Sequence, residues 1–200
     1  SHHVPVTPLI TGLLFLLGGS ILLEIALSLA FCFVVFFAFT IASYWGRVVG
    51  ISSVIILCLF QPYIHIFHQA SSDAIYATLL MLFFLVSFRF LHSQNYKTTI
   101  VIGLIAFLVY LTRNSGMILF VFWPSILVLL GLFGLTKFIK HALVFSCTCA
   151  ILLSCWATYF FITVDSFQTN FSSALFVINR IHYHDGIFYP ENGPASMELS

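Results

Sequence analysis

Long apolar stretches separated by short polar gaps run through most of this chain. The apolar blocks fall near residues 21–44, 48–68, 74–91, 98–112, 116–135 and 141–164. A helix needs about 20 apolar residues to cross the hydrocarbon core of a bilayer, and the first and last blocks exceed that length. The pattern therefore predicts an all-α, polytopic membrane bundle of about six spanning helices. The block at 98–112 is short for a span, so Thr98 and Arg113 would need to reach the two interfaces.

A shorter apolar stretch, residues 4–17, precedes these blocks. Its length of about 14 residues favours a short helix lying in the membrane interface rather than a span. Gly18-Gly19-Ser20 is expected to end this helix. In the block at 48–68, Gln61-Pro62 predicts a kink, because proline frees a backbone carbonyl of the helix.

The charged residues divide between the two sides of the predicted membrane. Five basic residues fall on one side: Arg47, Arg89, Lys97, Lys137 and Lys140. All the acids fall on the other: Glu24, Asp73, Asp165, Asp185, Glu191 and Glu198. Cytoplasmic loops carry an excess of Lys and Arg, so the basic side is predicted to be cytoplasmic. The unusual polar groups then gather on the outer side.

Composition agrees with a membrane protein and excludes several other classes. Hydrophobic residues make up 61% of the chain and charged residues 6%, against about 25% charged in soluble domains. A net charge of +1 argues against a nucleic-acid partner, which requires a concentrated basic face. The five cysteines form no disulfide framework and are interpreted as buried packing thiols.

The chain is expected to divide into a membrane domain, residues 1–165, and an outer tail, residues 166–200. It opens on Ser1-His2-His3 without an initiating Met, which we interpret as the middle of a longer protein. No repeat or low-complexity linker divides the membrane domain.

Asp73 and Arg113 are the sharpest candidates for chemistry. A carboxylate in a membrane is costly unless it faces protein or water, although Asp73 also suits a simple role at a helix start with Ser71 and Ser72. Arg113 is the basic residue of the outer helix connections, and a guanidinium suits phosphate oxygens; its alternative role is contact with lipid headgroups. One acid and one base therefore lie on the same side, each at a junction between helices.

Other polar residues on the outer side are weaker candidates. His65 and His68 have the spacing of two ligands on one metal ion, with Asp73 or His182 as a further ligand, or they are interfacial packing residues. A divalent metal is therefore possible, and no cofactor is certain. Tyr183 in the tail is a candidate for binding a polar substrate or a residue of a solvated loop.

Three motifs resemble the GT-C glycosyltransferases that use polyprenyl-phosphate sugars. They are His3-Val4-Pro5 with an apolar stretch ending in Gly18-Gly19, then Gln61-Pro62 with Ser72-Asp73, then Tyr110-Leu111-Thr112-Arg113-Asn114-Ser115-Gly116. The resemblance is to members of the protein O-mannosyltransferase and aminoarabinose-transferase type, including the RgtA/B/C/D-like family, and covers about residues 2–140. The chain departs from the family pattern at Val6, where a second proline is usual.

The resemblance implies a glycosyltransferase that moves a sugar from a lipid-phosphate carrier to a glycan, lipid or protein acceptor at the outer face. It implies catalytic roles for Asp73 and His3 and substrate contacts by Arg113 and Asn114, and we place His65, His68 and Tyr183 with them. The main catalytic acid would lie on an outer loop before Ser1. The implied location is a bacterial inner membrane, or the endoplasmic reticulum in a eukaryote.

Two other classes remain open at this stage. A transporter would place polar residues near mid-bilayer within broken helices, whereas here the polar residues gather at one rim. A non-catalytic membrane scaffold subunit would need no outer acid upstream of Ser1.

Overall fold

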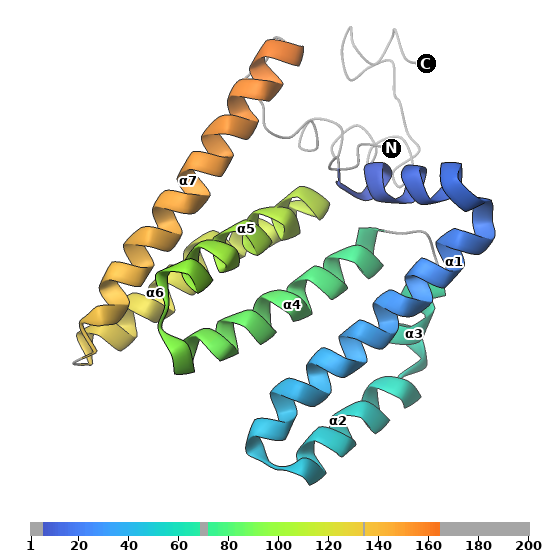
Figure 1. The fold of residues 1–200 in the computed structure, drawn as a ribbon, viewed down its shortest axis with the longest axis horizontal. Coiled ribbons are helices and arrows are strands. Elements are labelled where there is room, and N and C mark those ends of the chain that lie inside the picture. The colour runs from blue at the N-terminus through green and yellow to red at the C-terminus, as the bar shows by residue number, and fades with distance from the viewer. Residues whose placement is uncertain (1–5, 69–71, 134, 165–200) are drawn as a thin grey trace, which may run out of the picture. The chain divides into compact units, whose positions relative to one another are not determined.

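A computed structural model describes residues 6–68, 72–133 and 135–164, and helices are the regular secondary structure throughout those ranges (Figure 1). Residues His3–Trp156 form one compact unit, and the contacts described below lie within it. The elements are α1 (Val6–Ala42), η1 (Ser43–Trp45), α2 (Arg47–Leu59), α3 (Gln61–His68), α4 (Ser72–Ser93), α5 (Tyr96–Thr112), η2 (Asn114–Met117), α6 (Ile118–Leu132) and α7 (Lys137–Val164).

The break predicted at Gly18-Gly19 lies inside α1 and bends it into a short and a long part (Figure 1). Gly19 has φ 65° and ψ −157°, a conformation essentially restricted to glycine because a Cβ would clash with the backbone. The stretch before Gly18 is therefore a short helix that points in a different direction from the rest of α1, as the sequence predicts. Its position in a membrane interface stays a prediction.

The break predicted at Gln61-Pro62 separates α2 from α3, which are bent by 65° relative to each other. Phe60, between the two helices, has a non-helical ψ of 84°. Pro62 lies in the first turn of α3, where the missing N–H costs no helical hydrogen bond. The two short helices together form either one broken span or a re-entrant loop.

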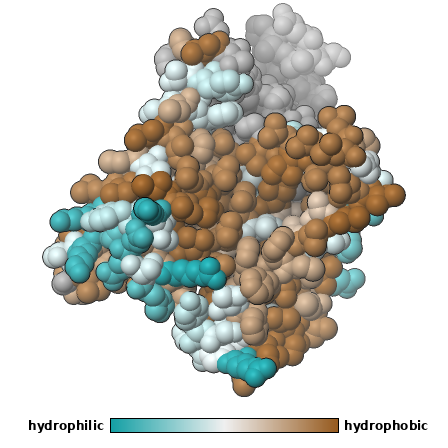
Figure 2. Space-filling view, viewed as in Figure 1, coloured by the Kyte–Doolittle hydropathy of each residue, from teal (hydrophilic) through white to brown (hydrophobic). Residues whose placement is uncertain are grey.

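Four described helices are long and apolar enough to cross a membrane, or up to five spans if α2 and α3 count as one. This is the architecture of a multi-pass integral membrane protein. Figure 2 shows the corresponding surface, which is mostly hydrophobic, with hydrophilic residues gathered near its edges. These exposed apolar helix faces would be unfavourable in water, and in a membrane they would contact lipid.

Helix α5 is shorter than the spans and is the most enclosed helix of the described chain. Its 17 residues extend about 25 Å, less than the roughly 30 Å hydrocarbon core. Nine of those residues are buried, so protein rather than lipid covers much of its length. Gly103 permits close packing against α7, since a Cβ there would lie 2.9 Å from Thr148 Cγ2.

Helices α4 and α5 run in opposite directions, so two ends of the unit are distinguished by the residues that meet there. At one end, Asp73 at the start of α4 meets Arg113 after the end of α5. At the other end, Phe90 near the end of α4 and Tyr96 at the start of α5 both contact the His141 ring, at centroid distances of 4.9 and 4.4 Å. We call these the Asp73 end and the His141 end.

The core of the bundle is built mainly from aromatic and aliphatic residues of α4 to α7. Trp123 of α6 packs edge-on against Phe83 and Phe90 of α4, with centroid distances of 5.7 and 6.4 Å. A second cluster joins α1, α3 and α4 through Leu27, Val34, Phe67 and Ala74. Helix α4 contributes to both clusters and so holds the two halves of the unit together.

Candidate functional site

Asp73 lies in the first turn of α4, where the aligned peptide dipoles favour a negative charge. The following residue, Ala74, is fully buried in the cluster with α1 and α3. This packing fixes the start of α4, and the Asp73 side chain remains 43% exposed. The carboxylate is therefore held in position while staying within reach of solvent.

Arg113 is a single residue of extended backbone between α5 and η2, with φ −157° and ψ 133°. Its backbone N–H donates to the Val109 carbonyl at 3.1 Å, and its carbonyl accepts from Gly116 N–H at 2.9 Å. The chain therefore leaves α5 and folds back at once in η2. The Arg113 side chain at this turn is 53% exposed, whereas the preceding residues Leu111 and Thr112 are buried.

Gly116 allows η2 to lie directly on the backbone of α5. A Cβ at this position would be 2.7 Å from the Tyr110 nitrogen and 2.8 Å from its Cα. Real side chains do not approach a backbone so closely, and the backbone of a helix cannot move aside as a flexible side chain can. The turn that follows Arg113 thus has a physical need for glycine at position 116.

Asp73 and Arg113 form an ion pair through Oδ1 and Nη1. The two residues are 40 positions apart in the chain, and the contact joins the start of α4 to the α5–η2 junction. The Arg113 Cζ also lies 6.0 Å from the centroid of the Tyr76 ring, a cation–π contact. Two groups from adjacent turns of α4 therefore hold the guanidinium.

Tyr76 is a member of this site that the sequence analysis did not single out. It lies three residues after Asp73, a spacing that puts two side chains on neighbouring positions of one helix face. That spacing was visible in the sequence, but an aromatic residue among so many others carried no distinguishing mark.

The arrangement suits recognition of an anion. A guanidinium has five N–H donors in a rigid fork, and the described contact with Asp73 uses Nη1. Because Arg113 is half-exposed, its other donors can reach a phosphate or carboxylate group. Asp73 accepts from the guanidinium through Oδ1, so this oxygen is engaged in the ion pair.

The other predicted site residues are His65, His68, Asn114, His3 and Tyr183. His65 and His68 are exposed on α3, and the described residues contain no group of three His, Cys, Asp or Glu side chains that converges as a metal site requires. Asn114 follows Arg113 in η2 and is partly buried. His3 and Tyr183 lie outside the described residues.

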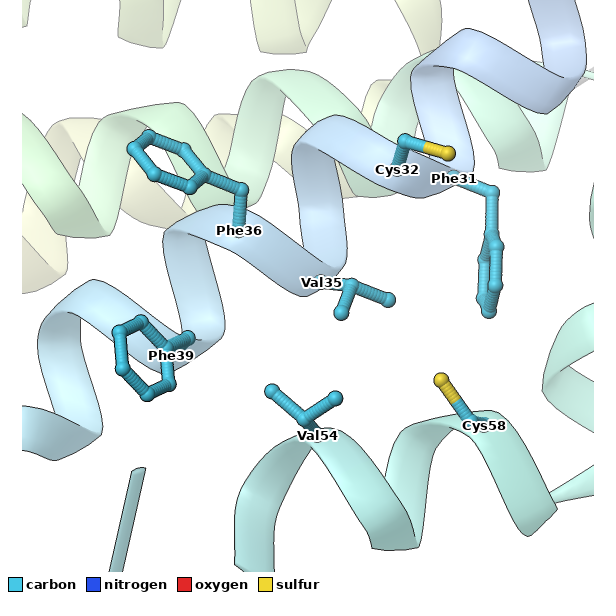
Figure 3. Close-up of a pocket in the computed structure, with 7 residues that line it drawn as sticks. All are labelled: Phe31, Cys32, Val35, Phe36, Phe39, Val54 and Cys58. Atoms are coloured by element: carbon cyan, nitrogen blue, oxygen red, sulfur yellow. The ribbon is translucent and has the colours of Figure 1, made fainter. Parts of the chain in front are cut away.

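An apolar groove of about 360 Å³ lies between α1 and α2 (Figure 3). Its walls are Phe31, Cys32, Val35, Phe36, Phe39, Val54 and Cys58. Cys32 and Cys58 line this groove and count as exposed, as do Cys147 and Cys155, whereas Cys149 is buried. The expectation of buried thiols was therefore wrong for four of the five.

A smaller pocket of about 170 Å³ lies between the two parts of α1 and the first turns of α4. Its walls are Ile10, Thr11, Leu14, Leu23, Ala26, Leu27, Ala30, Ile75, Thr78 and Leu79. The two threonine hydroxyls donate to carbonyls of their own helices, Thr11 to Thr7 and Thr78 to Ala74, at 2.8 and 2.9 Å. Their donors are thus already used, and the pocket is suited to hydrocarbon.

His141 is a buried histidine that the sequence did not indicate as a candidate. His141 Nδ1 and Thr99 Oγ1 are hydrogen-bonded at 2.8 Å, linking α7 to α5, and the His141 side chain is 3% exposed. The available indication was its spacing from Phe138 and Phe145, three residues before and four after, which places His141 on the apolar face of α7.

Replacing Thr99 with valine is expected to destabilise the unit by about 1 kcal/mol, because the buried His141 nitrogen loses its partner. Thermal unfolding in detergent, followed by circular dichroism, measures the effect. Thr98→Val provides the matched control, since Thr98 is the partly exposed neighbour. In the double variant Thr99→Val/His141→Phe most of the lost stability should return, and a double variant no better than the single one would contradict a pairwise bond.

Comparisons of the chain with protein-family models, with curated proteins and with solved structures found no match, so the case for this site rests on its own geometry: a half-exposed Asp73–Arg113 pair in a multi-pass helical protein.

Proposed function

We propose that this protein is a glycosyltransferase that takes a sugar from a polyprenyl-phosphate carrier and transfers it to an acceptor at the outer face of a membrane. The observation that carries the proposal is the exposed Arg113 guanidinium, held by Asp73 and Tyr76 at a junction between apolar helices. A cation fixed at such a place can bind the phosphate of a lipid whose tail stays in the bilayer. The resemblance to GT-C enzymes supplies the reaction.

The apolar pocket beside the first turns of α4 supports a lipid substrate. Ile75, Thr78 and Leu79 line that pocket, and Asp73 and Tyr76 come from the same two turns of the helix. Hydrocarbon and phosphate would therefore meet the same helix at different faces. A water-soluble sugar donor would have no use for the pocket.

The proposed chemistry assigns separate tasks to the two charged residues. The acceptor hydroxyl oxygen attacks the anomeric carbon, the bond from that carbon to the phosphate oxygen breaks, and the lipid phosphate departs. Arg113 stabilises the negative charge that develops on the departing phosphate. Asp73 orients Arg113, and the hydroxyl proton passes to a carboxylate that the family resemblance places before Ser1.

The proposal also assigns a topology to the chain. The six apolar blocks cross the membrane, with α2 and α3 together as one broken span and α5 as a short span enclosed by protein. The first part of α1 lies in the outer interface. Arg47 and the other basic residues at the His141 end face the cytoplasm, which leaves Asp73 and Arg113 outside.

The direct test is an assay of carrier release by the intact protein in membrane vesicles. A panel of polyprenyl-phosphate-linked sugars, labelled in the polyprenyl chain, is supplied to vesicles of the native membrane, which contain the acceptor, and free polyprenyl phosphate is measured, so the acceptor need not be identified. Asp73→Asn is expected to lower the rate by about 10- to 100-fold, because Arg113 loses the group that orients it. Glu24→Gln, which changes the other described carboxylate, is the control and should retain the rate. Turnover of no member of the panel would overturn the proposal.

A further inference from the structure

Five cations gather around the His141 end of the unit. They are Arg47, Arg89, Lys97, Lys137 and Lys140, and all five are exposed. We refer to these five residues, with the aromatic residues Tyr44, Trp45 and Tyr96, as the basic surface. Ring contacts and one hydrogen bond bring these residues, which are far apart in sequence, to one surface.

One stacked and one edge-on ring contact attach η1, which directly precedes α2, to the last turns of α4. Tyr44 lies 5.3 Å from the His92 ring, and Trp45 lies 5.1 Å from the Phe88 ring. Arg47 comes two residues after Trp45, and Arg89 directly follows Phe88. The two arginines are thereby placed at the same end of the unit.

Contacts of the buried His141 place the three lysines at this same end of the unit. His141 contacts Phe90 of α4 and Tyr96 of α5, and it is hydrogen-bonded to Thr99. Lys137 and Lys140 lie within the turn that precedes His141, and Lys97 directly follows Tyr96. The lysines therefore surround the junction of α5 with α7.

No described carboxylate neutralises these charges. The acidic residues of the described ranges are Glu24 and Asp73, and Asp73 is paired with Arg113 at the opposite end. Glu24 lies 20 residues before Tyr44 along α1, which corresponds to about 30 Å of helix. The basic surface therefore has a positive charge that calls for an anionic partner from outside the described chain.

The aromatic residues indicate at what depth that partner lies. Tyr44, Trp45 and Tyr96 are 50%, 65% and 49% exposed, and they lie where the apolar helices end. Tyrosine and tryptophan are enriched where membrane helices reach the lipid headgroups, because their rings are apolar with one polar group. Cations beside them lie at the level of lipid phosphates.

We propose that the basic surface binds the headgroups of anionic phospholipids in the leaflet at the His141 end. Lysine and arginine contact the phosphates, and the aromatic residues hold the surface at headgroup depth. An acidic protein would match the charge but would not need exposed aromatic rings at the ends of apolar helices. This binding is separate from sugar transfer at the Asp73 end, and the test below uses no sugar donor.

Quenching of Trp45 fluorescence by brominated lipids tests the proposal. The intact protein carries Trp156→Phe, so that Trp45 is the exposed tryptophan of the described chain, Trp123 being 6% exposed. It is reconstituted in bilayers that contain phosphatidylglycerol or phosphatidylcholine brominated near the headgroup. Each cation that contacts an anionic headgroup contributes about a fivefold preference, so phosphatidylglycerol should bind beside Trp45 about fivefold or more tightly than phosphatidylcholine.

The double variant Arg47→Gln/Arg89→Gln, which removes the two cations placed beside Trp45, should bring this preference towards one, whereas the double Arg→Lys variant, which keeps the charges, should retain it. High salt should weaken the preference of the unmodified surface, because screening shortens the reach of exposed charges. This salt titration serves as the readout if the glutamine variant does not fold. Equal quenching by both lipids at low salt, or a preference unaffected by the two glutamines, would overturn the proposal; equal quenching would instead favour an acidic protein partner.

Discussion

Replacing Arg113 with alanine is expected to lower the release of polyprenyl phosphate by about 100- to 1,000-fold, the usual effect of removing one group that stabilises transition-state charge. The protein should still insert and fold. An ion pair between side chains exposed by 53% and 43% contributes about 0–1 kcal/mol to stability, which is too little to unfold the bundle. Carrier release and thermal unfolding of the same vesicle preparations give the two measurements.

A double variant separates phosphate binding from a merely structural role of the pair. In Asp73→Gln/Arg113→Gln the longer side chain at position 73 offsets most of the length lost at position 113, so that two amides can hydrogen-bond and maintain the link between α4 and the α5–η2 junction. If the pair only joins the helices, this variant should restore the rate of the wild type. If Arg113 binds the phosphate, the rate stays as low as in Arg113→Ala, because no cation is left. Arg113→Lys should retain part of the rate, since it keeps the charge and loses the fork.

Replacing Gly116 with alanine is expected to have the second largest effect, because it acts on the backbone that presents Arg113. The added Cβ would lie 2.7 Å from the Tyr110 nitrogen, so η2 must move away from α5. Crowding of this kind costs about 1–3 kcal/mol. A displacement of about 1 Å at a reacting centre can lower a rate by about 100-fold. The unfolding temperature and the rate should therefore both fall, the rate more severely.

Ser115→Ala is the matched control for this change, since Ser115 is the exposed neighbour in the same turn. It should leave the unfolding temperature and the rate close to those of the wild type. Wild-type behaviour of Gly116→Ala would show that η2 does not need its close contact with α5. Equal losses in both variants would mean that the turn tolerates no change, whatever its distance from the α5 backbone.

The breaks and ends of the helices could be predicted because their causes are local. Gly18-Gly19 bends α1 and Gln61-Pro62 separates α2 from α3, in both cases because of backbone properties that belong to the residue itself. The number of spans could not be settled in this way. Among the described residues, four helices meet the length and hydropathy of a span, or up to five, against the six expected, because α5 is short and α2 is interrupted.

The partners within the site could be predicted only in part. The sequence placed Asp73 and Arg113 on one side of a membrane, and the structure shows them in contact. Tyr76 was missed, as was the hydrogen bond between Thr99 and His141. These contacts depend on which faces of α4, α5 and α7 meet. The sequence of a uniformly apolar helix does not indicate which of its faces contacts a neighbour.

The sequence by itself determined that this chain forms apolar helices, where two of them break and how their charges are distributed along the chain. Tertiary structure alone decided that the Arg113 guanidinium meets the carboxylate of Asp73 and the ring of Tyr76, and that α5 becomes an enclosed helix. The physical reason is that α5 is apolar on all sides, so no stripe of polar residues marks an outer face. Close packing then decides which residues touch. For example, the absence of a side chain at Gly103 leaves room for Thr148.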